Sequence, residues 1–147
     1  MDTSEKALSL FRKGSGFNCA QAVLAAYASQ LNLETKVAFK IAAAFGGGIA
    51  RTGGNCGAVS GALMVIGLRY GTSDIEDQDS KAYTYEKARQ FLERFKELHQ
   101  TVICRELTGY DISTPEGLQQ FKEQEVGASL CTGFIRDAVQ IVEEIIK

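Results

Sequence analysis

Residues 55–70 read NCGAVSGALMVIGLRY, and this stretch decides the fold. It is apolar almost all the way round a helical wheel, which is typical of a helix that is buried on every side. Gly57 and Gly61 lie four residues apart, and Ala58 and Ala62 repeat that spacing, so one face offers little side-chain bulk. We therefore predict that Asn55–Tyr70 forms a central helix that another backbone approaches closely.

Helical signals continue on both sides of this stretch. Apolar residues recur three and four positions apart, the chain has a single Pro, and alternating apolar and polar runs are scarce. Further helices are predicted from Asp2 or Thr3 to Lys13, at Asn18–Leu31, at Glu34–Phe45, at Ser73–Gln100, around Cys104, from Thr114-Pro115-Glu116 onward, and at Cys131–Ile146. The sequence thus predicts an all-α protein, a bundle of about six to eight helices in one domain over residues 1–147.

The composition narrows the function classes. The chain has 147 residues, of which 45% are hydrophobic and 23% charged, as in an ordinary globular domain. A net charge of -2 and the lack of a long basic run predict no nucleic-acid binding. The longest apolar region, Ala58–Leu68, is too short to span a bilayer, so we expect no membrane insertion.

The sequence also allows expectations about the cellular location and the oligomeric state of the protein. The N-terminal residues Met1–Lys6 lack the basic start and apolar stretch of a signal peptide, which predicts a cytoplasmic protein. Burial of excess apolar surface by self-association would give a homodimer, which we keep as an expectation.

Four cysteines are the main chemical feature of the chain: Cys19, Cys56, Cys104 and Cys131. In the cytoplasm cysteines stay reduced unless they are catalytic or bind metal. They are widely spaced and form no CxxC pair, so neither a thioredoxin motif nor a zinc-ribbon knuckle is present. Any joint site must therefore be assembled by the fold from four separate segments.

All four cysteines are predicted to lie at helix ends. Asn18 precedes Cys19 and Asn55 precedes Cys56, and Asn is a favourable N-cap, so each Cys is expected to be the first helical residue. At that position, unpaired backbone N–H groups and the helix dipole favour the thiolate, the form that binds metals or attacks disulfides. Helix ends that share this feature are expected to converge on a cofactor or a reactive pair.

Three uses of the four thiols are open at this point. They could ligate an iron–sulfur cluster, for which wide sequence spacing is no obstacle. They could act as a metal-free thiol/disulfide switch. They could instead hold structural zinc, or be inert buried thiols.

Four segments carry a resemblance to a known family: Gly16-Phe17-Asn18-Cys19, Cys56-Gly57-Ala58-Val59-Ser60-Gly61, Cys104-Arg105-Glu106-Leu107, and Cys131. They resemble the C_GCAxxG_C_C family of redox-active proteins, and the resemblance covers nearly the whole chain. It implies a redox site made of the four cysteines, with a redox partner protein or a small-molecule thiol as the partner. A related domain in split-Soret cytochromes favours iron–sulfur or electron-transfer chemistry. The chain has no CxxCH, so covalently attached haem is not expected.

The remaining candidates are weaker. The glycine-rich stretch Phe45–Gly54 could cradle an anion, but it lacks the Lys-Ser/Thr ending of a phosphate loop, so we interpret it as a turn that brings Cys56 to its partners. Arg51 in this stretch is expected to stabilise a thiolate or an anionic cluster. His99 is expected at the surface, and the acidic run Asp74–Asp79 as a solvated helix start rather than a calcium loop. No Ser-His-Asp order or carboxylate pair indicates an enzyme mechanism.

Overall fold

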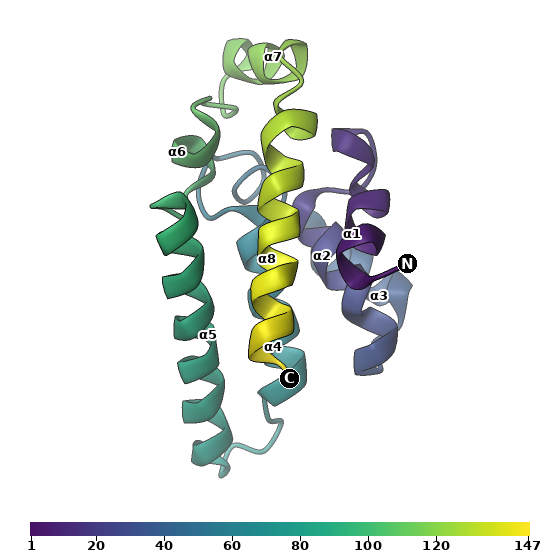
Figure 1. Ribbon diagram of the computed structural model, residues 1–147, viewed down its shortest axis with the longest axis vertical. Coiled ribbons are helices and arrows are strands. Elements are labelled where there is room, and N and C mark those ends of the chain that lie inside the picture. Colours follow the sequence, from purple (N-terminus) through teal and green to yellow (C-terminus); the bar gives the residue numbers. More distant parts are fainter.

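A computed structural model describes all residues, 1–147, and is 71% helical (Figure 1). Eight helices and no strands confirm the prediction of an all-α fold. The helices are α1 (Thr3–Phe11), α2 (Cys19–Ala28), α3 (Thr35–Ile41), α4 (Gly57–Tyr70), α5 (Gln78–His99), α6 (Cys104–Thr108), α7 (Pro115–Glu123) and α8 (Thr132–Ile145). No helix combines the length and the apolar character needed to cross a bilayer.

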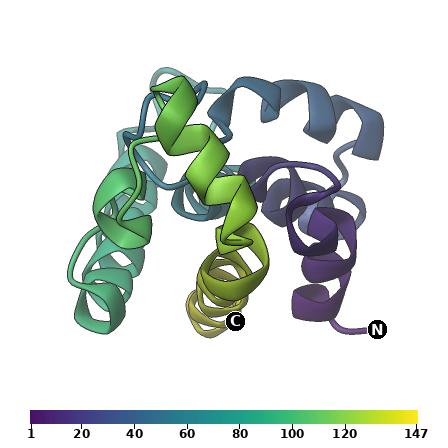
Figure 2. The same ribbon diagram turned by 90° about the horizontal axis from the view of Figure 1, so that it is seen from above.

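The helices form two groups. In Figure 1, α4, α5 and α8 run along the long axis of the molecule, and α1, α2 and α3 lie beside them. The short helices α6 and α7 cap one end of the long group, where α5 finishes and α8 starts. Figure 2 looks down on this end and shows α7 leading directly into α8. The two groups of helices therefore meet near the starts of α2, α4, α6 and α8.

Helices α2 and α4 share the most extensive contact in the molecule. Eight of the ten residues of α2 are buried, as are eight of the fourteen of α4. The centre of the core is therefore formed by two helices, α2 and the predicted central helix α4. Gly57 and Gly61 provide the close approach: a Cβ on Gly61 would lie 2.8 Å from the Ala20 carbonyl oxygen, and one on Gly57 would lie 3.1 Å from the Cys19 Cβ. The absence of side chains at these glycines therefore sets how close α2 comes to α4.

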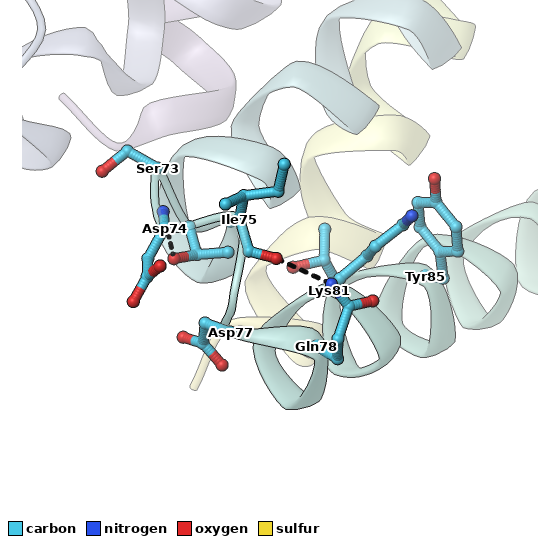
Figure 3. A pocket seen from close by; sticks show the side chains of 10 residues that line it. Ser73, Asp74, Ile75, Asp77, Gln78, Lys81 and Tyr85 are labelled. Carbon is cyan, nitrogen blue, oxygen red and sulfur yellow. Dashed lines mark hydrogen bonds between the residues drawn. The ribbon is translucent and has the colours of Figure 1, made fainter.

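One predicted helix start is wrong by five residues. Helix α5 begins at Gln78 rather than at Ser73, because the acidic residues ahead of it form turns. Asp74 accepts a hydrogen bond from the Glu76 N–H, and Asp77 caps the helix by accepting one from the Ser80 N–H, each at 3.0 Å. Figure 3 shows these side chains around an open surface pocket of about 350 Å³ that contains no cysteine.

Candidate functional site

Cys19 is the first residue of α2, as predicted. The Asn18 Oδ1 accepts a hydrogen bond from the Gln21 N–H at 2.8 Å, and the Gln21 side chain accepts one from the Asn18 N–H at 3.0 Å, which completes a capping box. The Asn18 side-chain amide also donates to the Ala43 carbonyl at 3.1 Å. The capping box and one hydrogen bond to the turn after α3 thus hold Cys19 at a helix N-terminus.

Cys56 is the N-cap of α4 itself, which corrects the prediction that Asn55 caps this helix. The backbone N–H groups of Ala58 and Val59 at this helix start favour the Cys56 thiolate and lower its pKa. Burial nevertheless raises the pKa of Cys56 to about 12, and the two N–H donors offset only part of that rise. Asn55 instead donates from its side chain to the Ser60 hydroxyl at 2.9 Å.

Cys104 is tied to Cys56 by a short antiparallel pairing of backbone. The Cys56 N–H donates to the Val102 carbonyl at 2.7 Å, and the Cys104 N–H donates to the Gly54 carbonyl at 2.6 Å. Asn55 and Ile103 form the bridge between these bonds. Burial raises the pKa of Cys104 to about 11. This pairing, between segments about fifty residues apart, places the second and third cysteines next to each other.

Cys131 directly precedes α8, so the predicted start of the last helix at Cys131 is within one residue of the observed one. It is the last residue of a π-helical turn, Gly127–Cys131, that runs directly into α8. Gly127 packs against Gly14 at the end of α1, and a Cβ on Gly127 would lie only 3.4 Å from the Gly14 Cα. This contact brings the turn against the segment that leads to Cys19.

Cys19 and Cys131 are neighbouring thiols whose pKa values are shifted in opposite directions. The hydrogen bond from Cys19 lowers the pKa of Cys131, because it stabilises the Cys131 thiolate. The same bond, together with burial, raises the pKa of Cys19 well above its ordinary value. All four cysteines are free thiols, so Cys131 is the group of this pair that loses its proton first.

All four cysteines line one cavity of about 240 Å³. Phenylalanine, leucine and isoleucine side chains form the apolar part of the remaining wall, contributed by Phe11, Phe17, Leu107, Ile112, Leu118, Phe121 and Phe134. Arg51 and Lys122 are the only charged residues in the lining, and it includes no carboxylate and no imidazole. The predicted convergence of the four thiols is therefore present in the fold.

The glycine-rich stretch closes this cavity on one side with an unusual backbone. Five consecutive residues from Gly47 to Arg51 have positive φ angles between 52° and 70°. The next amide N–H groups, from Ala50 to Gly54, all donate to carbonyls within the stretch or just before it. These bonds hold residues 50–54 in a turn, as the sequence predicted for this stretch. A Cβ on Gly48 would lie 2.8 Å from the Cys104 Cβ, so glycine is required where the loop passes that cysteine.

The donor set fits a thiolate-bound metal group in its chemistry. Four thiols face one cavity that has more room than a single water molecule needs, about 30 Å³. As the side chains lie, no group of three or more His, Cys, Asp or Glu residues is close enough to hold one metal ion. A shared metal would therefore require the thiol side chains to turn toward one another across the cavity.

His99 does not line this cavity. Its Nε2 is 2.8 Å from an Asp137 carboxylate oxygen, and its ring packs edge-on against Phe134, which does line the cavity. The side chain is only 20% exposed, so the expected surface histidine is half-buried. Thr108 and Lys122 also line the cavity, and no sequence pattern indicated them, because α6 and α7 reach the cavity only through the tertiary fold.

The fold and the cavity define a helical protein with a buried four-thiol site. The sequence model of the C_GCAxxG_C_C family, described as "Putative redox-active protein (C_GCAxxG_C_C)", matches residues 17–145. The chain therefore belongs to this family, as its cysteine segments predicted. No curated protein and no solved structure matches the chain.

Proposed function

We propose that the protein carries out redox chemistry with a group held by Cys19, Cys56, Cys104 and Cys131, and that this group is an iron–sulfur cluster. One observation carries the proposal: four thiols from four separate segments line the same cavity, with no other metal-binding side chain in its wall. Thiolates are the usual ligands of iron–sulfur clusters. Membership of a family described as redox-active supports the same chemistry.

The surroundings of the thiols suit an anionic metal group. Cys19 begins one helix and Cys56 caps another, so the positive ends of two helix dipoles face the cavity. The backbone N–H groups of Ala58 and Val59, which favour the Cys56 thiolate, would raise the reduction potential of a bound cluster, as would the cations of the wall. The apolar walls keep bulk water away from the group.

Each residue of the site then has a task. The four thiolates would hold the cluster, which supplies the capacity to accept and release one electron at a time. Burial raises the pKa of Cys56 and of Cys104, so these thiols keep their protons at neutral pH until metal binding displaces them. Gly48 lets the loop at Gly47–Arg51 pass close to Cys104, and so helps to shape the wall.

A second candidate, a metal-free thiol/disulfide protein, is favoured by the hydrogen bond between Cys19 and Cys131. The Cys131 thiolate would attack one sulfur of a small disulfide and release one thiolate from it. Cys19 would then attack the Cys131 sulfur and release the second. The protein gains one disulfide and loses two electrons and two protons, and the small disulfide leaves as two thiols.

Anaerobic reconstitution tests the two candidates together. Reduced protein is incubated with ferrous iron and sulfide, desalted, and assayed for iron, sulfide and visible absorbance, with zinc loading as a parallel sample. We expect stoichiometric iron and sulfide with a charge-transfer band, and loss of both in a Cys56→Ala variant. Colourless protein that binds no iron but cycles between four and two free thiols would overturn the cluster proposal in favour of the disulfide. Colourless protein that retains only zinc would support a structural zinc site.

A further inference from the structure

The charged residues of the cysteine cavity are all of one sign. Arg51 and Lys122 line it without any carboxylate, although the whole chain carries a net charge of -2. Neither side chain forms an ion pair, since the three pairs of the molecule are Arg94–Glu144, His99–Asp137 and Arg105–Asp111. The cavity is therefore a locally positive site in a weakly negative protein.

The cations and the sulfurs lie at different depths. Arg51 and Lys122 are exposed, whereas Cys56, Cys104 and Cys131 are buried. A molecule that enters the cavity thus meets the two cations first and the thiols afterwards. The rest of the lining carries no further charge for a ligand to satisfy.

Both cations come from elements that the fold holds in place. Arg51 ends the left-handed turn, and its side-chain stem lies over Gly47, where an added Cβ would come within 2.8 Å of the Arg51 Cγ. Lys122 is in the last turn of α7, whose start is capped by the Thr114 hydroxyl. Because the two residues belong to separate segments, their placement on one cavity is a property of the tertiary structure.

From this arrangement we infer that the cavity admits small anionic sulfur compounds, and that its natural partner is a carboxylate-bearing low-molecular-weight thiol in its reduced or disulfide form. The carboxylate would be held by Arg51 and Lys122, and the sulfur would reach the cysteines below. At about 240 Å³, the space suits a small ligand or the sulfur-bearing end of a larger one. The inference rests on the proposed redox use of these cysteines, and it applies to the metal-free protein, in which the thiols are free to meet the ligand.

The inference can be tested on the reduced, metal-free chain by comparing two alkylating reagents. Iodoacetate is anionic and iodoacetamide is neutral, and both react with the same thiolates, so the ratio of their rates is insensitive to thiol pKa. All four cysteines line the cavity, so every alkylated thiol reports on it. Peptide mass spectrometry assigns the reacting cysteine.

We expect the iodoacetate-to-iodoacetamide ratio to fall by about two- to fivefold in each of Arg51→Gln and Lys122→Gln, as befits exposed charges. Arg51→Lys should keep the ratio of the natural protein, because it keeps the charge. Lys81→Gln, at the far end of α5 beside the pocket of Figure 3, is the control for net charge. In 1 M salt the differences should vanish through screening.

A second measurement addresses the sulfur ligand itself. Thiol loss is followed with three small disulfides that differ in charge: dithiodiglycolate, bis(2-hydroxyethyl) disulfide and cystamine. We expect dithiodiglycolate to oxidise the natural protein fastest and cystamine slowest, and the order to flatten in the double variant Arg51→Gln/Lys122→Gln.

The two arms separate the inference from the function on which it rests. Unchanged ratios in both cation variants, or an equal fall in Lys81→Gln, would overturn the inference whatever the outcome of metal loading. Failure to bind iron, with the charge selectivity intact, would overturn the cluster proposal and leave the anionic thiol partner standing.

Discussion

The contact between α2 and α4 predicts opposite effects for two Gly→Ala changes in the same helix. Gly61 faces α2, where an added Cβ would lie 2.8 Å from the Ala20 carbonyl oxygen and 3.0 Å from the Val23 Cβ. Gly67 is two turns further along α4, and an added Cβ there meets nothing within 4 Å. Both substitutions increase helix propensity by the same amount. The difference between their effects on the free energy of unfolding therefore reports the packing of α4 against α2.

The magnitudes follow from the two surroundings. Gly67→Ala should raise the free energy of unfolding by about 0.5–1 kcal/mol, because alanine loses less backbone entropy than glycine in a helix. Gly61→Ala gains the same amount but forces α2 and α4 apart, at a cost of about 1–3 kcal/mol. The two variants should therefore differ by about 1–3 kcal/mol, with Gly61→Ala the less stable.

Urea unfolding of the reduced proteins, followed by far-ultraviolet circular dichroism, measures this difference directly. The m-values should be equal, so that the change in midpoint reports stability alone. If the two variants unfold at the same urea concentration, α2 does not approach α4 through Gly61. The way in which the fold brings Cys19 to Cys56 would then need another account.

Further predictions concern the cap, the thiols and the loop. Asn18→Ala should lower the free energy of unfolding by about 1 kcal/mol through loss of the capping box, measured by urea melts. Burial raises the pKa of Cys56 in the fold, so the stability of the metal-free protein should fall as pH rises above about 8.5, less steeply in Cys56→Ala. Cys19→Ala should raise the pH at which Cys131 becomes reactive to iodoacetamide, because it removes the hydrogen bond that lowers the pKa of Cys131. Ile49→Gly should stabilise the protein in the same urea melts by up to about 1 kcal/mol, since Ile49 has a φ of 70°.

The sequence predicted the structure correctly wherever interactions between residues close in the chain determine the local conformation. Asn18 with Gln21, and Thr114 with Pro115, form their helix starts as predicted, because capping needs only residues three positions apart. The central stretch at Gly57–Tyr70 is a buried helix because its apolar side chains cover its whole circumference.

The placements of Cys56 and Cys131 have reasons that lie outside their own stretches. Asn55 does not cap α4, because its backbone pairs with Ile103 and its side chain is bonded to Ser60. That pairing depends on where residues 102–105 arrive, which no local pattern indicates. Cys131 ends a π-helical turn whose place is set by the packing of Gly127 on Gly14. The shared placement of the four cysteines at helix ends was enough to predict that the thiols converge. The contacts that hold each cysteine in place join distant segments, so they could not be predicted.

Two of the departures from regular backbone border the cysteine cavity. One is the left-handed run at Gly47–Arg51, in which three residues that are not glycine have positive φ, each at a cost of about 1–2 kcal/mol. The other is the π-helical turn at Gly127–Cys131, a form that is rare and frequent at functional sites. A protein of this size has a net stability of about 5–15 kcal/mol, so such costs are a sizeable fraction of it. Strain of this kind persists where the surrounding structure enforces it and a site depends on it. Its location in these two segments, beside Cys104 on one side and at Cys131 on the other, supports the proposal that the protein uses this cavity, and it does so independently of the thiols.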